Sequence, residues 1–332
     1  MQPLRIVSYG LGPIGVRAAS LVLERKGLTL VGAIDTAADK VGRDLAELLA
    51  LAEPTGIRVE GDARAALERL RPDAVIHCTS SFLPAVKEQL LEAARLGIDV
   101  VSSTEEMLVP ELQHPELARE LDQAARAGGA TLVGTGINPG FAMDFVAVVA
   151  SAVCRRVERV RCVRVVDAGT RRLPLQRKVG ASMSTAEFDE RARSGGFGHI
   201  GMRESVALVA RGLGLQIDAI EQSLAPVVSE RAHTTPFLTV APGQVAGIRN
   251  IGAGKRGGET VVELDLSMYV GAPDPCDEVF LEGEPRVHLR FEGGLPGDLA
   301  TAAILVNTLP SVVEASPGLK TVLDLPPPRF RP

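Results

Sequence analysis

The stretch Arg5–Gly15 reads Arg-Ile-Val-Ser-Tyr-Gly-Leu-Gly-Pro-Ile-Gly, an apolar strand followed at once by a G-x-G-x-x-G turn. Gly10 permits the tight turn, and Gly12 lets the backbone approach a diphosphate. Gly15 lets the following helix pack closely on the strand. A Gly-rich turn placed between a strand and a helix therefore predicts a Rossmann unit that binds a dinucleotide.

The start of that helix and the end of the next strand also indicate a dinucleotide site. Pro13 suits the first helical position, where its missing N–H costs nothing, and Ile14 continues the helix, whose N-terminus attracts phosphate. Asp35 ends the second expected strand, where a carboxylate binds the adenosine ribose hydroxyls. Because a carboxylate repels a 2′-phosphate, Asp35 favours NAD. Lys40 and Arg43 follow closely and could contact such a phosphate, which leaves NADP as the alternative.

Short apolar runs alternate with helical patterns through the first half of the chain. This alternation predicts βαβ units and a parallel sheet that is covered on both faces. The expected strands are Leu4–Tyr9, Leu28–Asp35, Ala74–Thr79, Val100–Ser103 and Thr131–Thr135, and helices are expected at Ile14–Arg25 and Ala85–Leu96.

Longer strands replace this pattern after Val157 and favour a second, α+β domain built on a largely antiparallel sheet. The strands expected there are Val160–Asp167, Phe237–Val240 and Thr260–Tyr269. We assign residues 1–140 to a Rossmann dinucleotide-binding domain and 141–296 to an α+β substrate and dimerisation domain. Residues 297–332 are expected to form a helix and tail that return to the Rossmann domain.

Composition narrows the range of functions. A chain of 332 residues with 45% hydrophobic content can build a large core, and its net charge of −5 argues against a nucleic-acid partner. Four scattered cysteines form no C-x-x-C pair, so no metal site is expected. No apolar run is long enough for a membrane span, and no leader is apparent. We therefore expect a cytoplasmic protein that acts on small molecules.

Polar residues follow three of the later strands. Thr79, Ser80 and Ser81 follow one, Ser102–Glu106 the next, and Asn138 comes after the last. Ligands bind at this edge of an open parallel sheet, so these residues are candidates for the cofactor site. Ser80 and Ser81 have an equally ordinary alternative as helix N-caps, and Asn138 has one in an Asn-Pro turn.

Together with the glycine turn, several segments resemble the 2,4-diaminopentanoate dehydrogenases and the related NAD(P)-dependent native amine dehydrogenases, which belong to the dihydrodipicolinate-reductase-like group. The resemblance implies reductive amination of a ketone or aldehyde with ammonia, or the reverse deamination of an amine. The matching segments are Gly10–Gly15, Ser102–Met107, Gly134–Phe141, Gly198–Ser205 and Gly297–Ala302.

The resemblance also implies an acid–base glutamate after the fifth strand. Glu105 and Glu106 both match. We favour Glu105, and since consecutive side chains point apart, we expect one of the two to face the substrate. The alternative is a solvated Glu-Glu pair that caps the following helix. We assign to the substrate pocket Ile137, Phe141, His199 and Thr301, although His199 also suits a purely structural role.

Two other functions are less consistent with the sequence. A dihydrodipicolinate-type reductase of a cyclic imine would resemble enzymes with paired histidines followed by lysines, and no two histidines are adjacent here. A non-catalytic NAD-binding regulator would need a partner-binding module such as a basic helix, which the acidic balance disfavours.

A substrate carboxylate would need a cation, for which Arg171, Arg172, Arg177, Lys178 and Arg203 are candidates. A solvated charge run is the more ordinary explanation of the first four. A homodimer is expected through the apolar strands Thr260–Tyr269 and Val287–Phe291, which a single helix layer would leave partly exposed.

Overall fold

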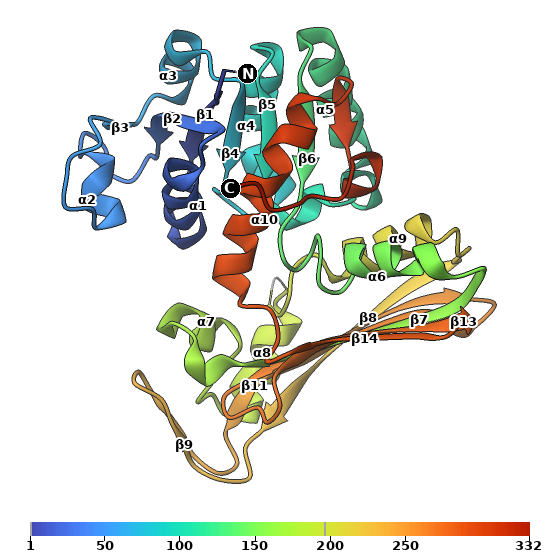
Figure 1. Cartoon of the computed structure of the whole chain (residues 1–332). Helices are drawn as coiled ribbons and strands as arrows, with labels where there is room; N and C mark the ends of the chain where they lie inside the picture. The colour runs from blue at the N-terminus through green and yellow to red at the C-terminus, as the bar shows by residue number, and fades with distance from the viewer. Residues whose placement is uncertain (1, 196) are drawn as a thin grey trace. The chain divides into compact units, whose positions relative to one another are not determined.

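The computed structural model describes residues 2–195 and 197–332, which form two compact units. Unit 1 runs to Gly140 and also contains Pro296–Pro332, whereas unit 2 is Phe141–Leu295 (Figure 1). The C-terminal segment thus belongs to the same compact unit as the first strands of the chain.

Unit 1 is built on a seven-stranded sheet in the order β15-β6-β5-β4-β1-β2-β3, in which every strand pair is parallel. The order 3-2-1-4-5-6 is that of a dinucleotide-binding Rossmann sheet, which confirms the expected fold. The strands are β1 (Leu4–Tyr9), β2 (Leu28–Ile34), β3 (Val59–Glu60), β4 (Ala74–His77), β5 (Asp99–Ser102), β6 (Thr131–Gly134) and β15 (Gly318–Lys320).

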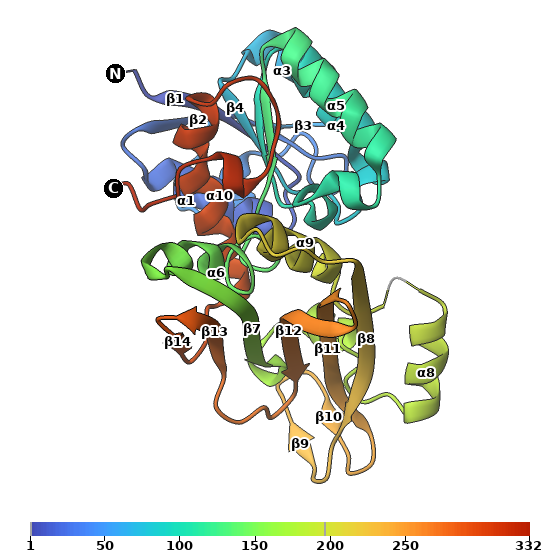
Figure 2. The same cartoon turned by 90° about the vertical axis from the view of Figure 1, so that its right-hand side faces the viewer.

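Helices cover both faces of this sheet, which explains why its strands are continuously apolar. One face packs into a core with α3, α4 and α5, where Val75 and Val100 meet Leu90 and Leu121. On the other face α1 and α10 lie side by side (Figure 2). The helices are α1 (Pro13–Glu24), α2 (Leu45–Leu49), α3 (Ala63–Leu70), α4 (Leu83–Arg95), α5 (Pro115–Gly128) and α10 (Gly297–Val313).

Unit 2 is built on a six-stranded sheet in the order β14-β13-β7-β12-β11-β8. Only β7 and β12 pair in parallel, so the sheet is largely antiparallel, as expected. The strands are β7 (Arg156–Asp167), β8 (Ala219–Val228), β11 (Val245–Arg256), β12 (Glu259–Tyr269), β13 (Cys276–Glu284) and β14 (Val287–Glu292).

Helices α6 and α9 pack on one face of the unit 2 sheet (Figure 1). Close packing there requires glycine in β11, because a Cβ on Gly252 would lie 2.7 Å from the Cγ of Met202 in α9. The helices are α6 (Phe145–Ala150), α7 (Leu173–Lys178), α8 (Thr185–Arg193) and α9 (Met202–Gly212).

The strand expected at Phe237–Val240 is shorter than the sequence suggested. Only Thr239–Val240 forms a strand, β10, which pairs with β9 (His233–Thr234). The N–H groups of Phe237 and Leu238 instead donate to the hydroxyl of Thr235, each at 3.1 Å. This local side-chain bond makes a turn where the apolar pattern indicated a strand.

Candidate dinucleotide and active site

The glycine turn forms a tight cradle at the start of α1. Gly10 has φ +90°, and a Cβ there would lie 2.5 Å from the carbonyl oxygen of Cys78. A Cβ on Gly15 would lie 1.8 Å from the carbonyl oxygen of Gly10. At Gly12, by contrast, a Cβ would meet no atom within 4 Å, so the space above the turn is open. Pro13 and Ile14 then open the helix. The cradle therefore fits a diphosphate at a helix N-terminus.

A cavity of about 430 Å³ lies against this cradle at the carboxyl ends of the strands. Among its lining residues the structure brings together Gly10, Gly12, Asp35, Thr79 and Ser80. Ser81, by contrast, is not in the lining, and its carbonyl accepts the N–H of Glu106 at 3.3 Å.

Asp35 follows β2 directly and is tied to the glycine turn. Its Oδ2 accepts the N–H of Leu11 at 2.7 Å and the ammonium of Lys40 at 2.8 Å, and its Oδ1 accepts the N–H of Ala37 at 2.9 Å. Burial raises the pKa of Asp35, but these hydrogen bonds outweigh it and hold the pKa below its usual value. The group is a carboxylate with acceptor capacity to spare, as ribose hydroxyls require.

The two cations that follow Asp35 are both engaged. Lys40 pairs with Asp35, whereas the Arg43 Nε donates to Glu47 at 2.9 Å. The sequence could not show that Lys40 neutralises the carboxylate expected to select the ribose.

A buried polar network joins the ends of β4 and β5. The His77 Nδ1 lies 2.9 Å from the hydroxyl of Ser102, which also accepts the N–H of Thr104 at 3.1 Å. The Thr104 hydroxyl donates to the carbonyl of Ser80 at 2.8 Å. Burial lowers the pKa of His77 to about 4, so its ring is neutral. This network, which sequence analysis missed, fixes the segment that precedes Glu105.

Glu105 and Glu106 lie in one 3-10 turn, Glu105–Met107, but their surroundings differ. Glu106 is buried, and its carboxylate accepts the N–H of Leu83 at 2.7 Å and the Nε2–H of His114 at 3.0 Å. It thereby caps the start of α4, the helix before it in the chain rather than the one after. Glu105 is only half-buried.

Ile137 and Thr301 of the expected substrate pocket meet within unit 1, where the N–H of Ile137 lies 3.4 Å from the Thr301 hydroxyl. Asn138, which follows Ile137 in the chain, is half-buried. Phe141 begins unit 2 and packs against its core.

His199 lies in the loop before α9. Its Nε2 is shielded from water and has no hydrogen-bond partner among the described residues. Burial, together with the charges of Lys178 and Arg164, lowers the pKa of His199 to about 3. The ring is therefore neutral, and its unpaired nitrogen is a group that a ligand could satisfy.

Residues 2–195 and 197–332 contain neither a metal-binding cluster nor a membrane-spanning helix. No group of three or more His, Cys, Asp or Glu side chains there could hold a metal ion. None of the helices in those ranges is long and apolar enough to span a bilayer. All four cysteines are free thiols.

Comparisons with known proteins identify the relatives of this chain. Residues 141–330 match the family model of the 2,4-diaminopentanoate dehydrogenase C-terminal domain. The chain is 30% identical to 2,4-diaminopentanoate dehydrogenase of Acetoanaerobium sticklandii, over 99% of this chain and 95% of that protein. It is 26% identical to an amine dehydrogenase of Streptomyces virginiae, over 96% and 95%.

Solved structures agree with these relatives. An amine dehydrogenase from Mycobacterium smegmatis is 32% identical and superposes with a TM-score of 0.86, covering 99% of this chain and 97% of that one. A dihydrodipicolinate reductase from Paenisporosarcina is only 13% identical, with a TM-score of 0.52 over 97% and 99% of the chains. That second likeness shows a shared fold alone.

Proposed function

This chain belongs to the 2,4-diaminopentanoate dehydrogenase family and is a nicotinamide-dependent amine dehydrogenase, and on that premise we propose that Glu105 is its acid–base residue. The observation that carries this proposal is the commitment of Glu106 to Leu83 and His114. A carboxylate that caps a helix from a buried position is poorly placed to exchange protons with a substrate. Glu105 is half-buried in the same turn, at the carboxyl edge of the sheet where the cofactor cavity lies.

Reductive amination needs a proton carrier at more than one step. Glu105 takes a proton from ammonium, which makes the nitrogen nucleophilic, and returns one to the carbinolamine oxygen as water leaves. Its carboxylate charge then stabilises the cationic imine. The bound nicotinamide supplies the hydride that reduces this imine to the amine. One glutamate held by the Ser102–Thr104 network can therefore serve the whole sequence.

The cofactor is held by the glycine cradle and by Asp35, and NAD is preferred over NADP. Support comes from the position of the Asp35 carboxylate beside the cradle, where a 2′-phosphate would be repelled. Thr79, Ser80 and Asn138 contact the cofactor near its nicotinamide end, and Ile137, Phe141, His199 and Thr301 contact the substrate.

The substrate carries a carboxylate, as 2,4-diaminopentanoate does. The support is electrostatic: burial lowers the pKa of His199, and the charges of Lys178 and Arg164 lower it further. In the described residues the Nε2 of His199 also has no hydrogen-bond partner. An ammonium can bind a carboxylate as a point charge.

Replacing Lys178 should separate two substrate classes. In Lys178→Gln the KM for 2-amino-4-oxopentanoate should rise about tenfold, because a charge-assisted contact is lost, whereas the KM for 2-pentanone should stay unchanged. Arg177→Gln, an exposed neighbour on the same helix, is the matched control. Steady-state assays with NADH and ammonia measure both constants, and equal changes for the two ketones would remove Lys178 from this role.

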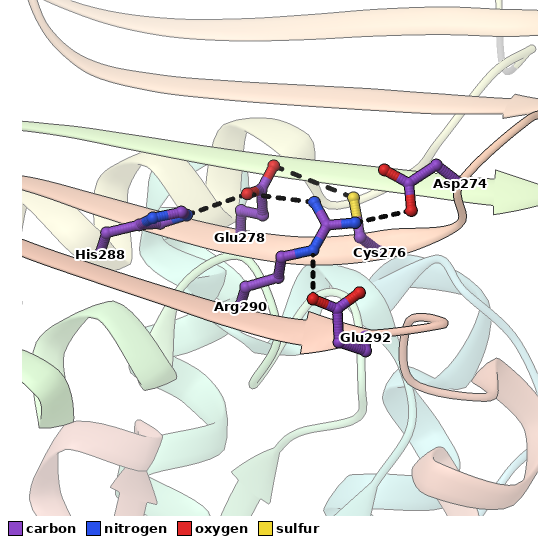
Figure 3. A network of polar contacts seen from close by, with 6 residues as sticks. All are labelled: Asp274, Cys276, Glu278, His288, Arg290 and Glu292. Atoms are coloured by element: carbon purple, nitrogen blue, oxygen red, sulfur yellow. Dashed lines mark hydrogen bonds and ion pairs between the residues drawn. The ribbon is translucent and has the colours of Figure 1, made fainter.

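A homodimer forms through the face of the unit 2 sheet that points away from α6 and α9. This face carries half-exposed Val163 and Val165, and Phe280 stacks on His288 at 4.3 Å. Around them an ion-pair network orders the edge (Figure 3): Arg290 binds Asp274 at 2.7 Å, Glu292 at 2.9 Å and Glu278 at 3.2 Å, and Glu278 also binds His288 at 2.9 Å. The Arg161 guanidinium also lies over the Phe280 ring, 5.7 Å from its centroid, and aromatic residues and arginine are both enriched at interfaces.

Light scattering at micromolar concentration should therefore give twice the mass of one chain, and Phe280→Glu should give a monomer, because it places a charge in the apolar centre. A monomeric mass for the unaltered protein would contradict this interface.

The free thiols agree with a reducing compartment, and we place the enzyme in the cytoplasm.

A further inference from the structure

A second cavity, of about 240 Å³, lies at the opposite edge of the unit 1 sheet from the dinucleotide cradle. It is formed where β1 and β2 begin, beside the end of α1 and the last turns of α10. Its lining includes Leu4, Leu28, Val306, Pro310 and Val313, so most of its wall is apolar. Because the cradle lies at the carboxyl ends of the strands, an occupant of this second cavity would not contact the cofactor.

Cationic side chains stand at the same cavity. Arg25, Lys26 and Arg331 all line it, together with two groups that can be negatively charged, the Glu314 side chain and the last residue, Pro332. The Nε of Arg25 is shielded from water and has no hydrogen-bond partner in the described part of the chain. A shielded guanidinium N–H without an acceptor is costly, and in folded proteins such groups are usually paired with a bound water, ion or ligand.

The guanidinium is also held in place. Its Cζ lies 4.3 Å from the ring centroid of Phe330, within the range of a cation–π contact. An ordered guanidinium offers two parallel N–H donors, which match the two oxygens of a carboxylate.

Backbone chemistry supplies a further polar group. Pro310 interrupts α10 and has no N–H, so the carbonyl of Val306 lacks the donor that an unbroken helix would give it. Both residues line the cavity, and Asn307 lies between them in the chain. The lining thus combines one shielded N–H donor on Arg25, a helix carbonyl without its usual partner and an apolar wall.

We propose that this cavity binds a small carboxylate with an apolar body, its carboxylate on Arg25 and its hydrocarbon part against the wall made by α10 and the starts of β1 and β2. A free phosphate would satisfy the cations but leave the apolar wall unfilled. A neutral apolar molecule would fill the wall but leave the Arg25 N–H unpaired. The site is separate from the reaction centre, and its existence does not depend on the proposed roles of Glu105 or Lys178.

Calorimetric titration with hexanoate, in the presence of saturating NADH, tests the proposal. The unaltered protein should bind hexanoate, and hexan-1-ol should bind at least tenfold more weakly because it lacks the charge that Arg25 recognises. Arg25→Gln should weaken hexanoate binding by at least tenfold. Arg95→Gln, which removes an exposed charge from the end of α4, should bind as the unaltered protein does.

Three other results would overturn the proposal. Absence of hexanoate binding at millimolar concentration would do so, as would equal affinity in Arg25→Gln. Binding that survives in Arg25→Gln and disappears in Lys178→Gln would place the carboxylate in the substrate pocket instead. Circular dichroism of each variant shows whether the fold is kept.

Discussion

Glu105→Gln should lower kcat for reductive amination by about 10²–10⁴-fold, because the proton carrier of the reaction is removed while the shape of the side chain is kept. The Kd for NADH, measured by fluorescence titration, should change less than about twofold, since Glu105 is absent from the lining of the dinucleotide cavity. The melting temperature should also stay close to that of the unaltered protein. Loss of rate without loss of binding or stability is the signature of a catalytic group.

Glu106→Gln is the matched control, and it should behave in the opposite way. Its carboxylate accepts from Leu83 and His114 in a buried position, so the amide should cost about 1–3 kcal/mol in the free energy of unfolding. Its kcat should remain within a few-fold of normal. A normal rate in Glu105→Gln with a collapse in Glu106→Gln would transfer the catalytic role to Glu106, and normal rates in both would remove the acid–base argument.

Asp35→Ala should reverse the preference between the two cofactors. Loss of charged hydrogen bonds to the ribose should raise the KM for NADH by about 10–100-fold. The KM for NADPH should rise less or fall, because the repulsion of a 2′-phosphate disappears and Lys40 loses its partner at 2.8 Å. The ratio of kcat/KM for NADH to that for NADPH is the quantity to measure.

Lys40→Gln distinguishes the effect of the Asp35 carboxylate from that of the Lys40 charge. It keeps the Asp35 carboxylate and removes the cation, so NADH kinetics should stay within a few-fold of normal while NADPH becomes a poorer cofactor. An unchanged NADH to NADPH ratio in Asp35→Ala would show that this carboxylate serves only to hold the N–H of Leu11 in the glycine turn.

Much of unit 1 could be predicted from the sequence because its signals are local. The strand at Leu4–Tyr9 is as expected, and the helix after it differs from the expected range by one residue at each end. The largely antiparallel sheet of unit 2 is also as expected, but individual strands there did not stand out in the sequence. In β11, for example, Gly252 and Gly254 break the apolar pattern, and only the close approach of Met202 and Val206 explains them.

The location of the candidate site could be predicted from the sequence, but the separate roles of its residues could not. Sequence position places both glutamates after β5, yet only the structure shows that Glu106 binds Leu83 and His114. Leu83 is 23 residues away from Glu106 in the sequence, and His114 belongs to no recognisable motif. The same holds for His77, an apolar-strand histidine whose role is visible only once Ser102 and Thr104 lie beside it. Contacts of this kind depend on tertiary packing, which no local pattern encodes.

The most direct test of the account is a reaction with ¹⁵N-labelled ammonium, NADH and 2-amino-4-oxopentanoate, followed by mass spectrometry of the product. The product should be a diamine that carries one ¹⁵N atom, and NADH consumption should require both ammonium and the ketone. NADH consumption that proceeds equally without ammonium and yields an alcohol would contradict it.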